Sequence, residues 1–151
     1  MAMAFLGAVG AAANCPTEVV WLRGDWGKAT FSVEIAKTPQ ERARGLQERE
    51  YLPLMAGMLF LFESPGPVAF WMKNTPISLD ILFVSETGTV TGIHREAVPF
   101  DPTLIRGGND TIAVLELNGG ISDRFGVAEG TEIRHPAFNQ DLAAWPCSDG
   151  G

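Results

Sequence analysis

The chain has 151 residues, of which 46% are hydrophobic and 19% are charged, a composition typical of one folded domain rather than of a disordered segment. Its 18 acidic residues outnumber its 11 basic ones, and the formal net charge of -7 argues against nucleic-acid binding. Two histidines are too few for a multi-histidine metal centre, and no cofactor fingerprint occurs. We therefore expect no metal, no cofactor and no nucleic-acid partner.

Residues 1–13 are small and apolar and end in an Ala-x-Ala pattern. This pattern is typical of the apolar region and cleavage site of a secretory signal, although the usual basic start is missing. The stretch is too short to span a bilayer. We interpret residues 1–13 as a leader or signal-peptide remnant and residues 14–151 as a single β-rich domain. The mature chain is then expected in the periplasm or the medium, without an integral membrane segment.

The two cysteines, Cys15 and Cys147, lie at opposite ends of the predicted domain. The termini of a domain often lie close together, and an exported protein meets an oxidising compartment. We predict a disulfide between them, with two free thiols as the alternative. A catalytic cysteine is less favoured because no obvious base adjoins either residue.

Alternating or continuous apolar segments bounded by turn residues predict strands. In chain order they cover residues 18–22, 29–36, 57–62, 68–72, 79–84, 89–97, 111–117 and 131–135. Thr38 and Glu41 form a capping box with Pro39 at the first helical position, which predicts a helix over about 38–49. Gly45 is costly inside a helix and indicates a closely packed neighbour.

A second, short helix is expected over residues 121–126, closed by Gly126, and the tail from about residue 137 is expected to be loose. Many short strands, mostly joined by hairpins, predict a mainly β fold. We expect an antiparallel sandwich or partly closed barrel with the helix at about 38–49 packed against it. The absence of regular strand–helix alternation argues against a Rossmann-type fold.

Four segments carry a family resemblance: Glu-Arg-Ala-Arg-Gly-Leu at 41–46, Gly-Met-Leu-Phe-Leu-Phe at 57–62, Phe-Trp-Met-Lys-Asn-Thr-Pro-Ile-Ser-Leu-Asp at 70–80, and Ala-Val-Leu-Glu-Leu-Asn-Gly-Gly at 113–120. Their order and spacing resemble the bacterial and archaeal domain of unknown function 192 family, from about Thr30 to His135. The resemblance implies a small, often exported, mainly β domain. It implies no particular activity and no set of catalytic residues.

Polar residues interrupt two apolar segments between Trp71 and Asp80. Asn74 tolerates turn conformations and Pro76 fixes the exit of the chain, so the interruption is first interpreted as a turn. The second interpretation is a ligand site in which Trp71 is an aromatic platform and Lys73, Asn74 and Asp80 supply polar contacts. The alternatives are a Trp71 that belongs to the core and an ion pair between Lys73 and Asp80.

Asp80, His94 and Glu116 are weaker candidates for a catalytic acid and base. Glu116 interrupts an apolar strand and needs a partner if it is buried. No nucleophile motif or phosphate loop accompanies them. The favoured hypothesis is a module that binds a small polar or carbohydrate-like ligand. The alternatives are a hydrolase- or lyase-like enzyme, which a perturbed carboxyl in a cleft would favour, and a structural or protein-interaction domain.

Overall fold

The computed structural model describes residues 15–149, so the leader predicted at residues 1–13 lies outside the described range. The fold is mainly β, which confirms the predicted class. The elements in chain order are β1 (Val19–Gly24), β2 (Gly27–Ala36), α1 (Pro39–Arg44), β3 (Ala56–Gly66), β4 (Ala69–Phe70), β5 (Leu79–Ser85), β6 (Val90–Ala97), β7 (Ile105–Arg106), β8 (Thr111–Asn118), α2 (Ile121–Phe125) and β9 (Glu132–Arg134).

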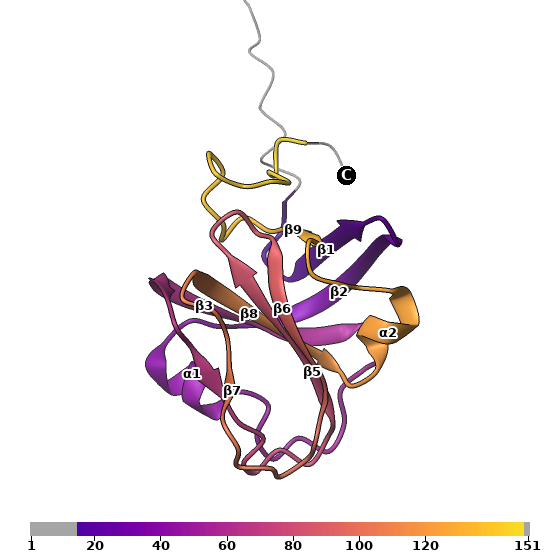
Figure 1. Ribbon diagram of the computed structural model, residues 1–151, viewed down its shortest axis with the longest axis vertical. Helices are drawn as coiled ribbons and strands as arrows, with labels where there is room; N and C mark the ends of the chain where they lie inside the picture. Colours follow the sequence, from indigo (N-terminus) through magenta and orange to yellow (C-terminus); the bar gives the residue numbers. More distant parts are fainter. Residues whose placement is uncertain (1–14, 150–151) are drawn as a thin grey trace, which may run out of the picture.

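Seven strands form one strongly curled sheet in the order β6-β5-β8-β3-β2-β1-β9, and β4 and β7 form a separate two-stranded ribbon (Figure 1). The two ends of the sheet approach each other, since the Val90 N–H donates to the Thr131 carbonyl at 2.8 Å and the Ile133 N–H donates to the Gly88 carbonyl at 2.7 Å. The predicted partly closed barrel is therefore confirmed.

Neighbouring strands of the large sheet are antiparallel except for β2 and β3, which are parallel. A parallel pair cannot be joined by a tight hairpin and needs a crossover connection. Here the crossover contains α1, which is thereby laid over one face of the sheet (Figure 1). This connection is what brings a helix next to the strands that build the site described below.

The buried apolar residues form two clusters, one on each face of the sheet. The first cluster draws on all seven strands, with members such as Val20, Leu115 and Ile133, and so fills the inside of the curl. The second includes Met58 and Ile81 and lies on the outer face. It is covered by residues of the α1 crossover and of the segments around β4 and β7.

Helix α1 is shorter than predicted. Its capping box is present, because the Thr38 hydroxyl accepts the Glu41 N–H at 3.1 Å and the Glu41 carboxylate accepts the Thr38 N–H at 3.2 Å. The helix ends at Arg44 because Gly45 has a φ of 50°, in the left-handed region. A Cβ on Gly45 would lie 3.2 Å from the Phe60 ring, which is the close neighbour that a glycine there predicts. Helix α2 ends at Gly126 as expected.

Two predicted strands have different bounds. β3 continues to Gly66, beyond the strand end predicted at residue 62, and it re-pairs with Thr111 after a register shift beyond Leu61. The strand predicted at 68–72 is reduced to the two residues of β4. Its partner β7 lies outside all the strands predicted from the sequence. Such short pairs depend on tertiary neighbours and leave little periodic signal in the sequence.

The tail predicted to be loose from residue 137 is packed over its described part, up to residue 149. Phe138 and Trp145 are buried, and the Arg23 guanidinium lies 4.4 Å from the centroid of the Trp145 ring. Cys147 forms a disulfide with Cys15, with 5.6 Å between their Cα atoms. The prediction failed because the anchoring contacts come from residues far away in the sequence.

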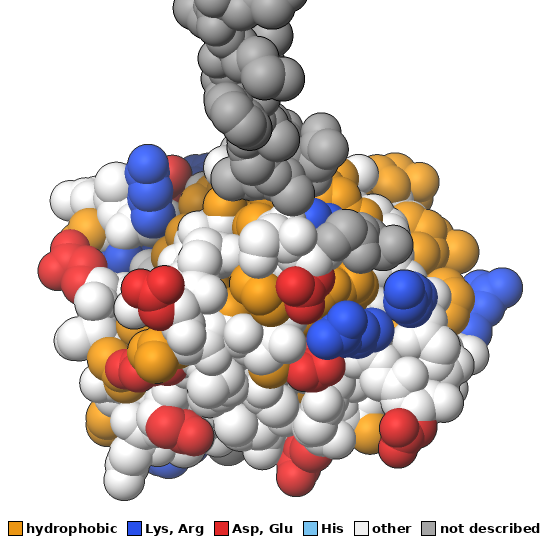
Figure 2. Space-filling model, turned by 90° about the horizontal axis from the view of Figure 1, so that it is seen from above, with side chains coloured by type: hydrophobic (Ala, Val, Ile, Leu, Met, Phe, Trp, Pro, Cys, Tyr) orange, Lys and Arg blue, Asp and Glu red, His pale blue; other side chains and the backbone are white. Residues whose placement is uncertain are grey.

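Acidic, basic and apolar side chains are interspersed on the end of the molecule that carries the C-terminal segment (Figure 2). No helix within residues 15–149 is long and apolar enough to cross a bilayer.

Candidate functional site

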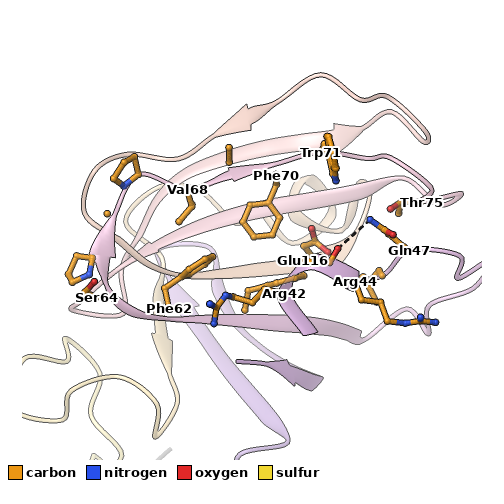
Figure 3. Close-up of a pocket in the computed structure, with 18 residues that line it drawn as sticks. Arg42, Arg44, Gln47, Phe62, Ser64, Val68, Phe70, Trp71, Thr75 and Glu116 are labelled. Carbon is orange, nitrogen blue, oxygen red and sulfur yellow. Dashed lines mark hydrogen bonds between the residues drawn. The ribbon is translucent and has the colours of Figure 1, made fainter. Parts of the chain in front are cut away.

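A cavity of about 630 Å³ lies on the outer face of the sheet. Its walls come from α1 and the turn after it, from β3, from the segment 64–71 that includes β4, from Thr75 and from β8. In Figure 3, Glu116 lies in the middle of the labelled side chains, with Phe70 and Trp71 above it and Arg42 and Arg44 below it. The volume is in the range of sites for small organic ligands.

Aromatic rings form much of the wall. The Phe70 ring packs edge-to-face on Phe60, with centroids 5.0 Å apart, and on Phe62, with centroids 6.4 Å apart. Such pairs hold the rings in place, because the positive edge of one ring meets the negative face of the other. Trp71 adds a fourth ring that is 44% exposed. The cavity therefore offers apolar surface to a ligand and an aromatic platform open to solvent.

Glu116 is the unusual residue of this cavity. Its register partners are Met58 on β3 and Ile81 on β5, so its side chain emerges from β8 among apolar neighbours on the outer face. It is only 4% exposed, and none of the hydrogen bonds or ion pairs found within residues 15–149 involves its carboxyl group. Burial raises the pKa of Glu116 to about 8. At neutral pH the carboxyl is therefore mostly uncharged and carries an O–H that can donate.

The basic side chains of the cavity do not neutralise Glu116. The Arg42 guanidinium donates to the Leu61 carbonyl at 3.0 Å and lies 5.0 Å from the centroid of the Phe62 ring, so it is held against the wall. Arg44 lines the cavity from an exposed position on α1. The ion pairs of the described residues are Arg23–Glu132, Arg49–Glu34 and Arg95–Asp123. Glu116 and the two guanidinium groups therefore line the same cavity without forming an ion pair.

The polar interruption after Trp71 is a turn that also shapes the cavity. Asn74 has a φ of 57°, and its carbonyl accepts the Glu48 N–H at 2.7 Å. The carbonyl of Thr75 accepts the Phe100 N–H at 3.1 Å. Three loops are thereby tied together at this turn, and Trp71 and Thr75 are placed in the cavity wall.

The residues predicted to bind a ligand have different roles in the structure. Trp71 lines the cavity, and its exposure excludes the alternative of a core residue. Lys73 is exposed, with its Nζ 5.1 Å from the centroid of the Trp71 ring. No ion pair joins Lys73 to Asp80 in the described part of the chain, so that alternative was wrong. Asn74 contributes through its backbone in the turn, and its side chain is not part of the cavity.

Asp80 is fully buried, and its carboxylate accepts hydrogen bonds from backbone N–H groups. It accepts N–H groups from Glu96 at 2.8 Å, from Gly120 at 3.1 Å and from Ser122 at 2.8 Å, which fixes the start of α2. Its register partner Leu117 belongs to the cluster inside the curl, so Asp80 lies on the opposite face of the sheet from Glu116. Fixing a helix start and a strand end is a structural role.

His94 is exposed on β6 and lines a different cavity, together with Asp101 and Arg106. Asp80, His94 and Glu116 are therefore in three separate places, and the predicted carboxylate–histidine pair is not assembled. Within residues 15–149 there is also no group of three or more His, Cys, Asp or Glu side chains that could hold a metal ion. Of the three catalytic candidates, Glu116 alone lines the cavity described above.

Comparison with known proteins shows to which family the chain belongs. The model of the family described as DUF192, "Uncharacterized ACR, COG1430", matches residues 20–135. The chain belongs to this family. The family match confirms the resemblance found in the sequence.

Two solved structures are similar to this DUF192 chain. One is a protein of unknown function from Novosphingobium aromaticivorans DSM 12444, with 41% identity, a TM-score of 0.75, and coverage of 76% of this chain and 82% of that one. The other is described as "a putative transcription regulator" from Sinorhizobium meliloti 1021, with 38% identity, a TM-score of 0.75, and coverage of 84% and 96%. No curated protein matches the chain.

Sequence reasoning missed most of the wall of this DUF192 cavity. Phe60, Phe62 and Phe70 were assigned to strands, and Arg42 lay in the helix predicted over about 38–49 without a role in a site. The available signal was Glu116, since a carboxyl group in an apolar strand must find a partner or lose its charge. The aromatic residues gave no comparable signal because core and cavity aromatics look alike in a sequence.

Proposed function

We propose that this DUF192 domain binds a small organic ligand in the Glu116 cavity. The observation that carries the proposal is the buried carboxyl of Glu116, which has no hydrogen-bond partner in the described protein and lines an open, aromatic-walled space. The carboxyl opens into the cavity, so a ligand there can supply the hydrogen bonds that no protein group makes with it.

The walls define the rest of the ligand. Rings of Phe62 and Phe70 favour an apolar or ring-shaped body, and Trp71 at 44% exposure can stack on a sugar or another flat group near solvent. The polar part of the ligand meets Glu116. The proposal keeps the small polar or carbohydrate-like ligand predicted from the sequence, and places it against Glu116 rather than against Lys73 and Asp80.

The test is a thermal-shift screen against sugars, amino acids, nucleotides and small amides, with Trp71→Ala and Tyr51→Ala as matched variants. Tyr51 is 75% exposed and does not line the cavity, so its removal controls for the loss of an exposed aromatic ring. At a ligand concentration of 100 times Kd the native state gains about 2.7 kcal/mol, a shift of several °C. We expect the shift in wild type and Tyr51→Ala and a smaller one in Trp71→Ala. Equal shifts in both variants, or none in wild type, contradict the proposal.

A second candidate function is acid catalysis by Glu116. A carboxyl whose pKa burial raises to about 8, placed in a cavity, is protonated at neutral pH and suited to act as a general acid. Among the described residues no second carboxylate and no histidine line this cavity, so a hydrolytic acid–base pair is not complete there. If a screen yields a converted compound, Glu116→Gln is expected to abolish turnover and to retain binding. Full turnover in Glu116→Gln excludes this candidate.

We do not extend the description of the Sinorhizobium relative to this chain. The net charge of -7 disfavours association with a phosphate backbone. On the face shown in Figure 2, basic side chains that lie near one another have acidic side chains beside them, so this face carries charges of both signs.

We also propose that the protein works outside the cytoplasm. The apolar leader at residues 1–13 and the disulfide between Cys15 and Cys147 support this location, because disulfides persist in oxidising compartments. The test is expression of the full chain in a bacterium, followed by fractionation, mass measurement and thiol titration. We expect an oxidised, leader-cleaved protein in the periplasm or medium. An uncleaved protein with free thiols in the cytoplasm contradicts the proposal.

A further inference from the structure

The groups that face Glu116 set the charge that a ligand can bring to it. β3 and β5 contribute the apolar register partners Met58 and Ile81, and β4 contributes the Phe70 ring. The only charged side chains of the described residues that line the cavity beside Glu116 are Arg42 and Arg44, both on α1. The lining around the carboxyl is therefore uncharged except on the helix side, where the positive charge lies; it combines apolar groups with the polar side chains of Gln47, Ser64 and Thr75.

A cationic ligand does not fit this arrangement well. An ammonium group in the cavity would be repelled by the two guanidinium groups, and it would gain from Glu116 only if that carboxyl gave up its proton. Loss of that proton is opposed by the burial that raises the pKa of Glu116 to about 8.

A ligand anion at the carboxyl is disfavoured for a related reason. Within residues 15–149 no guanidinium group is paired with Glu116, and that of Arg42 already donates to the Leu61 carbonyl. An anionic group of a ligand at Glu116 would therefore lose its hydration without a nearby cation to neutralise its charge. Its favourable place in this cavity is near Arg44, which is exposed.

A neutral carboxyl group offers one O–H donor and one carbonyl acceptor side by side. We infer that the cavity selects uncharged ligands that present an acceptor beside a donor, as a carboxamide or lactam does, and that Glu116 binds this pair in its neutral form while the aromatic wall holds the attached ring. This inference rests on the proposed function, since it specifies the ligand class of the same cavity.

The pH dependence of binding then has a definite sign. Ionisation of Glu116 removes the donor, so affinity for a carboxamide is constant while the carboxyl is neutral. It falls once the pH passes about 8, where the pKa of Glu116 lies, and by up to tenfold per pH unit beyond it. A cation would show the opposite trend, with affinity that rises as Glu116 ionises.

The test uses three probes that share one ring: benzamide, benzoate and benzylamine. Binding is measured by calorimetry between pH 6 and 9.5 on wild type, Glu116→Gln and Glu116→Leu, with folding checked by circular dichroism. We expect benzamide to bind at least tenfold more tightly than the two ions at pH 7. Glu116→Gln is expected to retain benzamide, because glutamine also carries a donor and an acceptor, and to lose the decline above pH 8. Glu116→Leu is expected to lose at least tenfold in affinity.

The outcomes that overturn the inference differ from those that overturn the proposed function. If benzylamine binds most tightly, or if its affinity rises through pH 8 and disappears in Glu116→Gln, the cavity binds cations. If benzoate binds most tightly and Glu116→Leu retains it, the polar group of the ligand meets the arginine side. Either result, or a screening hit without any benzamide binding, overturns the inference and leaves the cavity as a binding site. Absence of any shift in the wild-type screen, which itself includes small amides, overturns the proposed function.

Discussion

Replacing Glu116 by glutamine is expected to change how the stability of the protein depends on pH. The ordinary carboxyl pKa of 4.5 applies to the unfolded chain, whereas burial raises the pKa of Glu116 to about 8 in the folded protein. Between these values the folded state binds one proton more than the unfolded state. The free energy of unfolding therefore falls as the pH rises, by about 1.4 kcal/mol per pH unit and by about 5 kcal/mol over the whole interval.

The Glu116→Gln variant lacks this titration and keeps the size of the side chain. Its free energy of unfolding, relative to wild type, is expected to increase by about 5 kcal/mol between pH 4.5 and 8 and to stay level above pH 8. Urea unfolding followed by tryptophan fluorescence at a series of pH values measures this difference. Glu86→Gln is the matched control, because Glu86 is exposed in the hairpin between β5 and β6 and does not line the cavity.

A difference between wild type and Glu116→Gln that stays constant within about 0.5 kcal/mol from pH 4.5 to 9 would contradict the raised pKa of Glu116. That result would mean that the carboxyl is hydrated or paired in solution. A ligand would then find no unpaired carboxyl in the cavity to hydrogen-bond.

Three further changes test the structure. Asp80→Asn is expected to lower the free energy of unfolding by about 2–3 kcal/mol, because the NH2 group of asparagine would face the Ser122 N–H, donor against donor. Urea unfolding at pH 7 measures this change. An unchanged free energy of unfolding would contradict the stabilising role of the hydrogen bonds that Asp80 accepts. The Cys15–Cys147 disulfide joins residues that are 132 positions apart in the sequence. Its reduction is expected to lower the free energy of unfolding by up to about 5 kcal/mol, measured as the difference between unfolding curves with and without dithiothreitol. Burial lowers the pKa of His135 in the folded protein below its ordinary 6.5. As the pH falls, His135 is therefore protonated in the unfolded chain before it is protonated in the folded one, and the free energy of unfolding is expected to fall below about pH 6.5. A His135→Gln variant that follows wild type over pH 5–7 would contradict this sign.

Features that depend on residues adjacent in the chain could be predicted from the sequence. The capping box at Thr38 and Glu41 and the end of α2 at Gly126 are local, and both occur where they were predicted. Alternation of apolar residues located most strands, and the number of strands predicted a mainly β fold. Asn74 was predicted to turn the chain because asparagine tolerates a positive φ, and it does so.

The location of the Glu116 cavity depends on contacts between segments that are distant in the sequence. Alternation indicated that Glu116 shares a face with its neighbours at every second position, but not what covers that face. The parallel β2–β3 connection places α1 above it, and the β4–β7 ribbon completes the wall with Phe70. The candidates Asp80 and Glu116 were separated for a similar reason, since β5 and β8 pair in a register that turns the two carboxyl groups to opposite faces of the sheet. Contacts between distant segments set the burial of each group, and burial determines whether a carboxyl group is charged.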